Sequence, residues 1–210
     1  MTALLDELRW RYATKVFDAS RRLDDLQLDT LLESYRLCAT SFGLQPGKLL
    51  VVEDAELRAR LKAAAWNQSQ VTDASHLLVI CHRTGITHEE IDAHAARSAA
   101  SRGQEAASME GFGRMMKSVV DNRSPEQILD WNSRQGYIAL GWLMVCCARL
   151  GIDSCPMEGF EADKVNRILE LPARGLAVTA LLPVGYRAAT DAYAAIPKTR
   201  KSLDEVVERI

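Results

Sequence analysis

The sequence SPEQILDWNSRQGYIALGWLMVCCARLG, residues 124–151, predicts one long helix around which the rest of the chain must fold. Ser124 is a typical N-cap residue, and Pro125 is favoured at the first helical position because no N–H is needed there. We expect the helix to continue to about Leu150 and to be terminated by Gly151.

The second half of this helix is apolar on nearly every side. From Gly136 onward it therefore has to be buried all round, either as a central helix or against a second subunit. The longest apolar run, residues 137–148, contains 12 residues. A membrane span takes about 20, so this run indicates a buried helix and no membrane partner.

Hydrophobic periodicity predicts further helices, and one more should begin after Asp54, which can cap it. They cover residues 3–11, 25–38, 87–101, 104–120 and 162–170. Strands are expected at residues 49–52, 77–80 and 176–184. Because their apolar residues are continuous, the sheet should be covered on both faces. We predict a single α+β domain over residues 1–210, with a small sheet covered by helices.

Composition excludes a disordered or low-complexity chain: 48% of the 210 residues are hydrophobic, 26% are charged, and the net charge is −2. The charge is unevenly placed. Residues 9–22 hold five Lys or Arg and one acidic residue, and residues 196–201 hold three basic residues and no acidic one. Two short basic islands favour local anion sites over a nucleic-acid surface, although two solvated faces explain them equally well.

The cysteines and the N-terminal sequence both indicate a cytoplasmic protein. The first ten residues contain two acids and lack the apolar core of a signal peptide. The cysteines are odd in number, lie among apolar neighbours and form no CxxC pair, so we expect free thiols. They are Cys38, Cys81, Cys146, Cys147 and Cys155.

Several motifs that would indicate other chemistry fail on inspection. The stretch 43–48, GLQPGK, is one residue short for a phosphate loop and precedes a strand. His88 and His94 are six residues apart, which does not place them together on one helical face as metal ligands. No GxSxG or GxGxxG motif is present. We therefore predict no metal site, no catalytic triad and no Rossmann dinucleotide site.

Five polar segments, each a weak signal by itself, follow one another along the chain. They cover residues 11–18, 40–46, 67–76 and 156–160, and lastly 182–186 followed by 197–200. In this order they resemble the nitroreductase family of FMN-dependent NAD(P)H oxidoreductases, most closely its oxygen-insensitive nitroreductase and dihydropteridine reductase branch. The resemblance extends from about residue 4 to residue 207.

This resemblance implies a nitroreductase-like α/β sandwich, with a small mixed sheet covered by helices, that forms an intertwined homodimer. Tightly bound FMN would lie at the subunit interface and contact both chains, and the helix at 124–151 would build much of that interface. NADH or NADPH would donate electrons to a nitroaromatic, a quinone or a related small acceptor in a ping-pong cycle, with hydride passing through flavin N5.

The resemblance places the FMN phosphate on Arg11, Lys198 and Arg200, which unites the two basic islands. A phosphate dianion favours charged donors, and arginine can bind it with two hydrogen bonds. Tyr12 and Ala13 belong to the same segment, and Ala13 stands where many relatives have serine. The serine hydroxyl contact of those relatives is missing at Ala13, where only the backbone could contact the cofactor.

The remaining matches surround the flavin ring and its side chain. Lys15, Asn67 and Gln70 match its pyrimidine edge, where a cation favours reduction, although some relatives have a lysine in place of Gln70. Thr40, Ser41 and Phe42 would come from the partner subunit, and Gln135 would lie near the ribityl chain. Pro156, Met157, Glu158 and Gly159 match the segment on one flavin face. Backbone N–H groups there are favoured over the alternative that Glu158 is a general acid.

Substrate selection is assigned to the region 104–120, with Phe112 and Met116 as the candidate channel residues. The alternative is that both belong to the apolar face of a helix. Other functions on the same fold remain open: a free-flavin, pteridine or enone reductase, a flavin-fragmenting or dehalogenating enzyme, or a non-catalytic interaction protein that has lost FMN. The three matching cations argue against the last of these, and a short 104–123 region argues against the second.

Overall fold

The computed structural model describes residues 2–210 and contains a four-stranded sheet with the order β1-β2-β4-β3. The strands are β1 (Gly47–Val52), β2 (His76–Arg83), β3 (Asp153–Ser154) and β4 (Leu176–Gly185). Every pair of neighbouring strands is antiparallel. The mixed sheet that the resemblance implies is therefore wrong for these four strands, all of which pair antiparallel although long helical connections separate them. A parallel contact occurs at the isolated bridge between Ala13 and Ser154.

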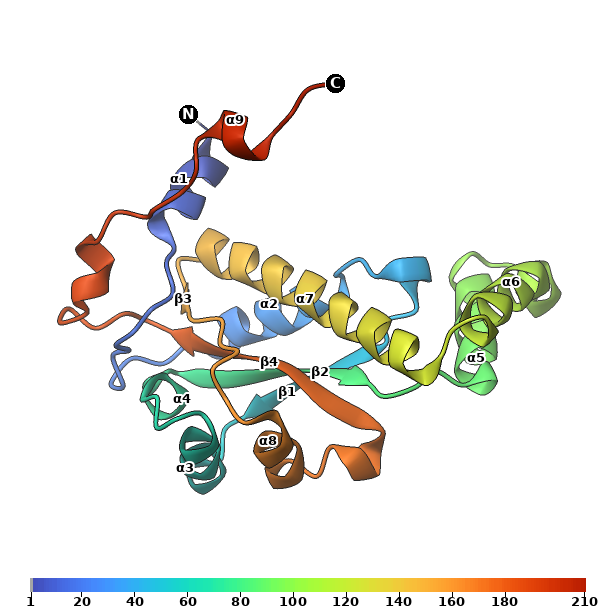
Figure 1. Cartoon of the computed structure of the whole chain (residues 1–210), viewed down its shortest axis with the longest axis horizontal. Coiled ribbons are helices and arrows are strands. Elements are labelled where there is room, and N and C mark those ends of the chain that lie inside the picture. The colour runs from blue at the N-terminus through green and yellow to red at the C-terminus, as the bar shows by residue number, and fades with distance from the viewer. Residues whose placement is uncertain (1) are drawn as a thin grey trace.

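Both faces of the sheet are buried, as the continuous apolar strands predicted. In β2, Leu77 and Val79 pack into the cluster formed with α3 (Ala55–Ala64), α4 (Gln70–Asp73) and α8 (Ala162–Ile168). Leu78 and Ile80 point the other way, into the cluster formed with α2 (Asp25–Arg36) and α7 (Pro125–Arg149). Figure 1 shows the two helical layers on either side of the strands.

Helix α7 runs across one face of the sheet, and its first turns reach beyond the strands toward the helices within residues 88–121 (Figure 1). Ser124 caps it as predicted: its hydroxyl accepts from the N–H of Gln127, whose side chain in turn accepts from the N–H of Ser124. At Gly136 the helix lies so close to β4 that an added Cβ would be 2.6 Å from Thr179 Oγ1. A glycine here leaves room for the Thr179 side chain between the helix and the strand.

The chain by itself does not bury α7 on all sides. The predicted alternative in which α7 is a central helix covered entirely by its own chain is therefore wrong. One stripe of the helix is exposed, with 42% of Tyr137, 49% of Ile138, 45% of Trp142 and 36% of Val145 accessible. Residues 2–210 leave this stripe partly uncovered, so of the two explanations for an all-apolar helix the central position alone is insufficient.

The other helices stand at the two ends of the molecule (Figure 1). α5 (His88–Ser101) and α6 (Glu110–Asp121) pack together beyond one end of the sheet, and a 3₁₀ turn at Ala106–Met109 joins them. At the opposite end lie α1 (Ala3–Trp10) and α9 (Leu203–Val206). None of the helices in the described residues 2–210 is long and apolar enough to cross a membrane.

Candidate functional site

The N-terminal segment after α1 and the C-terminal segment after β4 lie side by side (Figure 1). Isolated bridges join Ala13 to Ser154 and Phe17 to Arg187. The N–H of Ala188 also donates to the carbonyl of Val16 at 2.9 Å. The two basic islands, far apart in the sequence, therefore meet at one end of the sheet.

Arg11, Lys198 and Arg200 gather there. Burial, and then the charge of Arg200, lower the pKa of the Arg11 guanidinium. Burial, and then the charges of Arg11 and Arg200, lower the pKa of Lys198. Mutual repulsion of this kind requires the three cations to be close, so the structure brings the predicted phosphate ligands together.

One donor in this cluster has no partner. Arg11 Nε is buried and makes no hydrogen bond within residues 2–210, although a buried donor normally has one. The Lys198 ammonium donates to the carbonyls of Leu8 and Arg9, each at 2.6 Å, at the end of α1. An ammonium has three hydrogens, so one is left for an anion. The cluster therefore fits a phosphate group.

A third arginine, Arg187, lies next to the cluster and is held by an acid and two aromatic rings. Arg187 makes an ion pair with the buried Asp153, with Nη2 at 2.6 Å and Nε at 2.8 Å from Oδ1. Its guanidinium also lies 4.3 Å from the ring centre of Trp10 and 4.5 Å from that of Tyr12. These contacts fix the segment that carries the predicted residues Tyr12 and Ala13.

Lys15 lies beside this cluster, with Nζ 6.0 Å from the ring centre of Tyr193. Its backbone N–H donates to the buried carboxylate of Asp191 at 2.9 Å. The lysine side chain is half-buried at the edge of the site, and its main chain is held firmly.

The segment Pro156–Gly159 follows β3 and pairs with β4 through Met157 and Leu181, which exchange two backbone hydrogen bonds of 2.9 and 3.1 Å. Gly159 is packed so tightly that an added Cβ would lie 2.9 Å from the Trp66 ring. The amide of Gln68 donates to the carbonyl of Gly159 at 2.8 Å. The predicted flavin-face segment therefore contacts the predicted Asn67 segment.

Asn67 is exposed and has a left-handed backbone with φ of 58°, following Trp66 at 54°. Gln70 is 7% exposed at the start of α4. The buried guanidinium of Arg58 holds the following residues by donating to the carbonyls of Val71 and Ala74 at 2.8 and 2.5 Å. The residues that follow Asn67 are therefore held in place by Arg58. The positive φ values of Trp66 and Asn67 are typical of strained turns at functional sites.

The Glu158 side chain is engaged by Tyr137 of α7, whose hydroxyl donates to Oε1 in a short hydrogen bond. This bond, with partial burial, raises the pKa of Tyr137 to about 12. A carboxylate accepting such a bond is held in place as an acceptor, which agrees with a backbone role for this segment over an acid role for Glu158.

Thr40, Ser41, Phe42 and Gln135 form a separate group near the first half of α7. The N–H of Ser41 donates to Gln135 Oε1 at 2.9 Å. Gln135 and Arg149, which pairs with Glu7 of α1, lie about 20 Å apart along the helix. This group therefore does not join the cations of its own chain, which is the arrangement expected if the partner subunit supplies it.

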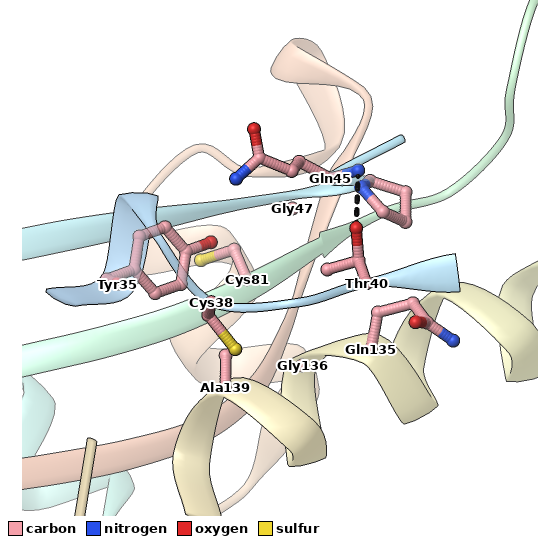
Figure 2. Close-up of a pocket in the computed structure, with 10 residues that line it drawn as sticks. Tyr35, Cys38, Thr40, Gln45, Gly47, Cys81, Gln135, Gly136 and Ala139 are labelled. Carbon is pink, nitrogen blue, oxygen red and sulfur yellow. Dashed lines mark hydrogen bonds between the residues drawn. The ribbon is translucent and has the colours of Figure 1, made fainter. Parts of the chain in front are cut away.

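The turn that carries these residues is strained and well anchored. Phe42 has a φ of 58° and Gln45 of 51°, values that bulky residues rarely adopt. Figure 2 shows Thr40 accepting a 2.9 Å hydrogen bond from the N–H of Gln45 beside a small cavity that Tyr35 and Cys81 also line. The cavity has a volume of about 30 Å³, which is too small for a flavin, so it is not the cofactor site.

The two candidate channel residues differ in position. Phe112 is half-buried and contacts Phe42 edge to face, with ring centres 6.4 Å apart. Met116 is 1% exposed, inside the cluster with Ile91 and Val120. It cannot contact a molecule in solution without displacing its neighbours, and it belongs to the apolar core of the α5–α6 layer.

Comparison with known proteins decides the family. The nitroreductase family model matches residues 8–186. The chain belongs to the nitroreductase family. A predicted NAD(P)H nitroreductase of Staphylococcus epidermidis is 35% identical over 217 residues, covering 99% of this chain and 96% of that protein. The crystal structure of a predicted nitroreductase of Bacillus subtilis has a TM-score of 0.87 at 22% identity, covering 98% of each chain. The structure of a predicted nitroreductase of Exiguobacterium sibiricum in complex with FMN has a TM-score of 0.83 at 19% identity, covering 100% of this chain and 98% of that one.

Four residues of this nitroreductase-family site were not found by sequence reasoning: Tyr137, Asp153, Arg187 and Asp191. Each acts by holding a segment that the sequence did single out. Single acids such as Asp153 and Asp191 give no sequence signal for this, because their partners are far along the chain. Tyr137 was hidden in the apolar run of α7.

Proposed function

We propose that this nitroreductase-family protein binds FMN and uses NADH or NADPH to reduce nitroaromatics, quinones or related acceptors. The observation that supports this most directly is the cluster of Arg11, Lys198 and Arg200, with the buried Arg11 Nε left without a partner. A phosphate monoester would supply acceptors to that donor and negative charge to all three cations.

The residues around the cluster bind and orient the cofactor. Arg11, Lys198 and Arg200 hold its phosphate, and Lys15 and Asn67 face the pyrimidine edge. The backbone of Glu158 and Gly159 orients the flavin face. When bound, FMN would supply the hydride chemistry that links the nicotinamide donor to the acceptor. The protein then needs no catalytic acid or base of its own.

We further propose that the protein is a homodimer in which α7 forms much of the interface and each site is shared. Two observations support this: the exposed apolar stripe of α7, and the distance between the Thr40–Phe42 group and the cations of the same chain. A second copy would cover the stripe and bring its own Thr40–Phe42 turn to the FMN. Phe112, which contacts Phe42, would then line the substrate channel.

The decisive experiment is to purify the protein and record its visible spectrum. A flavin absorbance that bleaches when NADH or NADPH is added without oxygen, and returns with a nitroaromatic or quinone, would support the proposed function. A colourless protein that does not take up added FMN would overturn it.

A further inference from the structure

Asp191 is a buried carboxylate, 4% exposed, that joins the two segments carrying the basic islands. One of its oxygens, Oδ2, accepts hydrogen bonds from the Tyr12 hydroxyl at 2.8 Å and from the N–H groups of Lys15 at 2.9 Å and Val16 at 3.1 Å. The other, Oδ1, accepts from the N–H of Tyr193 at 3.1 Å. One side chain therefore ties the N-terminal segment to the start of the segment that leads to Lys198.

We propose that Asp191 is a positioning residue that holds the phosphate cluster in its binding geometry before the anion arrives. This inference rests on the proposed FMN function. Asp191 does not itself touch the phosphate ligands. It acts on them through the main chain of residues 12–16 and through the segment that begins at Tyr193.

Like charges give such a residue something to oppose. Arg11, Lys198 and Arg200 are cations that lie together, and burial first, then the neighbouring positive charges, lower the pKa of Arg11 and of Lys198. Without an opposing force, loops carrying these charges would move apart, and binding would have to bring them together again. A buried negative charge bonded to both segments opposes that separation without occupying the anion site.

The charged form of Asp191 is the one that the structure favours. Burial alone would raise the pKa of this carboxyl, but hydrogen bonds from Val16, Tyr12, Lys15 and Tyr193 outweigh it and hold the pKa below its ordinary value. An amide is a poorer substitute because its oxygen has fewer acceptor sites, and its NH₂ group would face the donor N–H of Tyr193.

The test compares the affinities of Asp191→Asn and the wild type for FMN and for riboflavin, the same flavin without phosphate, by fluorescence titration. If Asp191 positions the phosphate ligands, Asp191→Asn raises the Kd for FMN about tenfold or more, since it weakens charge-assisted contacts, and changes that for riboflavin much less. Asp54→Asn is the matched control. It changes another carboxylate that accepts a backbone N–H, at the start of α3, and should leave both Kd values within about twofold.

Tyr12→Phe is the second variant, for the case that Asp191→Asn does not fold. It removes one donor to Asp191 and leaves the charge in place, so it should give a smaller loss of FMN affinity in the same direction. If the ratio of the FMN and riboflavin affinities stays that of the wild type, whether both affinities are unchanged or both fall equally, the positioning role is overturned. Failure of the wild-type protein to bind FMN would overturn the proposed function instead.

Discussion

At the scale of single residues, the site depends on charges that are gathered against their own repulsion. Arg11 contributes most clearly, because its Nε is buried without a partner and burial lowers its pKa. Such a group is costly for the empty fold and becomes favourable when an anion supplies acceptors. This is a physical reason to assign it to ligand binding and not to stability.

Arg11→Ala should therefore weaken FMN binding about tenfold or more, taking one charge-assisted contact at roughly 1.5 kcal/mol or above. Equilibrium titration with FMN measures this directly. Arg60→Ala, which removes an exposed arginine from α3, is the control and should bind FMN as the wild type does. An unchanged affinity for Arg11→Ala would remove this residue from the phosphate site.

Two histidines at the ends of β2 should make the fold sensitive to acid. Burial lowers the pKa of His76 and of His82, which also has a hydrogen bond to Thr179 Oγ1 at 2.8 Å. Below their ordinary pKa of 6.5 the unfolded chain binds more protons than the native one, so the free energy of unfolding must fall with falling pH.

Urea unfolding measured between pH 8 and pH 5 should show this loss, up to about 1 kcal/mol per pH unit for each histidine. His82→Gln should make the decline shallower, because it removes one of the two groups. A decline as steep as that of the wild type would show that His82 does not cause it.

At the scale of elements, the position of α7 depends on a missing side chain at Gly136 and on the N-cap at Ser124. Gly136 lets the helix lie on β4, while the cap at Ser124 sets where the helix begins. The same helix presents packed residues to the sheet and the stripe with Tyr137 and Trp142 to the outside. One element therefore contributes to the core, to the Glu158 contact and to the proposed interface.

Gly136→Ala should destabilise the protein by about 1–3 kcal/mol, because the new methyl group would overlap the Thr179 side chain. Gly111→Ala in α6 is the control. Its Cβ would meet nothing closer than 4.0 Å, so the better helix propensity of alanine should leave stability unchanged or raise it by up to about 1 kcal/mol. Urea unfolding distinguishes the two, and equal effects would contradict the close approach of α7 to β4.

At the scale of the whole molecule, the arrangement of the two residue groups argues for a site completed by a second copy. The cations lie at the α1 end of the sheet, and the Thr40–Phe42 turn packs toward the α5–α6 end. A single chain therefore offers two half-sites, and dimerisation and FMN binding should depend on each other.

Ile138→Asp, which places a charge in the exposed stripe of α7, should weaken the dimer and lower FMN affinity together. Sedimentation should give twice the chain mass of 23.3 kDa for the wild type and a smaller mass for the variant at low concentration. Ala63→Asp on the exposed side of α3, across the sheet from α7, should change neither. A monomer that binds FMN as tightly as the wild type would contradict the shared site.

Local sequence signals were sufficient for most elements. The cap at Asp54, the cap at Ser124 and the stop near Gly151 were predicted because each depends on neighbours within a few residues. The two-residue strand β3 and the 3₁₀ turns were missed, since such short elements have no periodicity to detect. The phosphate cluster required the family resemblance, because composition could not tell a binding site from a solvated face.

The sequence by itself determined the α+β class, the long helix, the sheet buried on both faces and the positions of the two basic islands along the chain. Only the tertiary structure decided that the strands are antiparallel, that α7 keeps an exposed stripe, and that Asp191 and Arg187 bond to groups far along the chain. The physical reason is range. Helix caps and apolar periodicity act between near neighbours, whereas a carboxylate at residue 191 meets its donors at residues 12–16 only after the chain has folded.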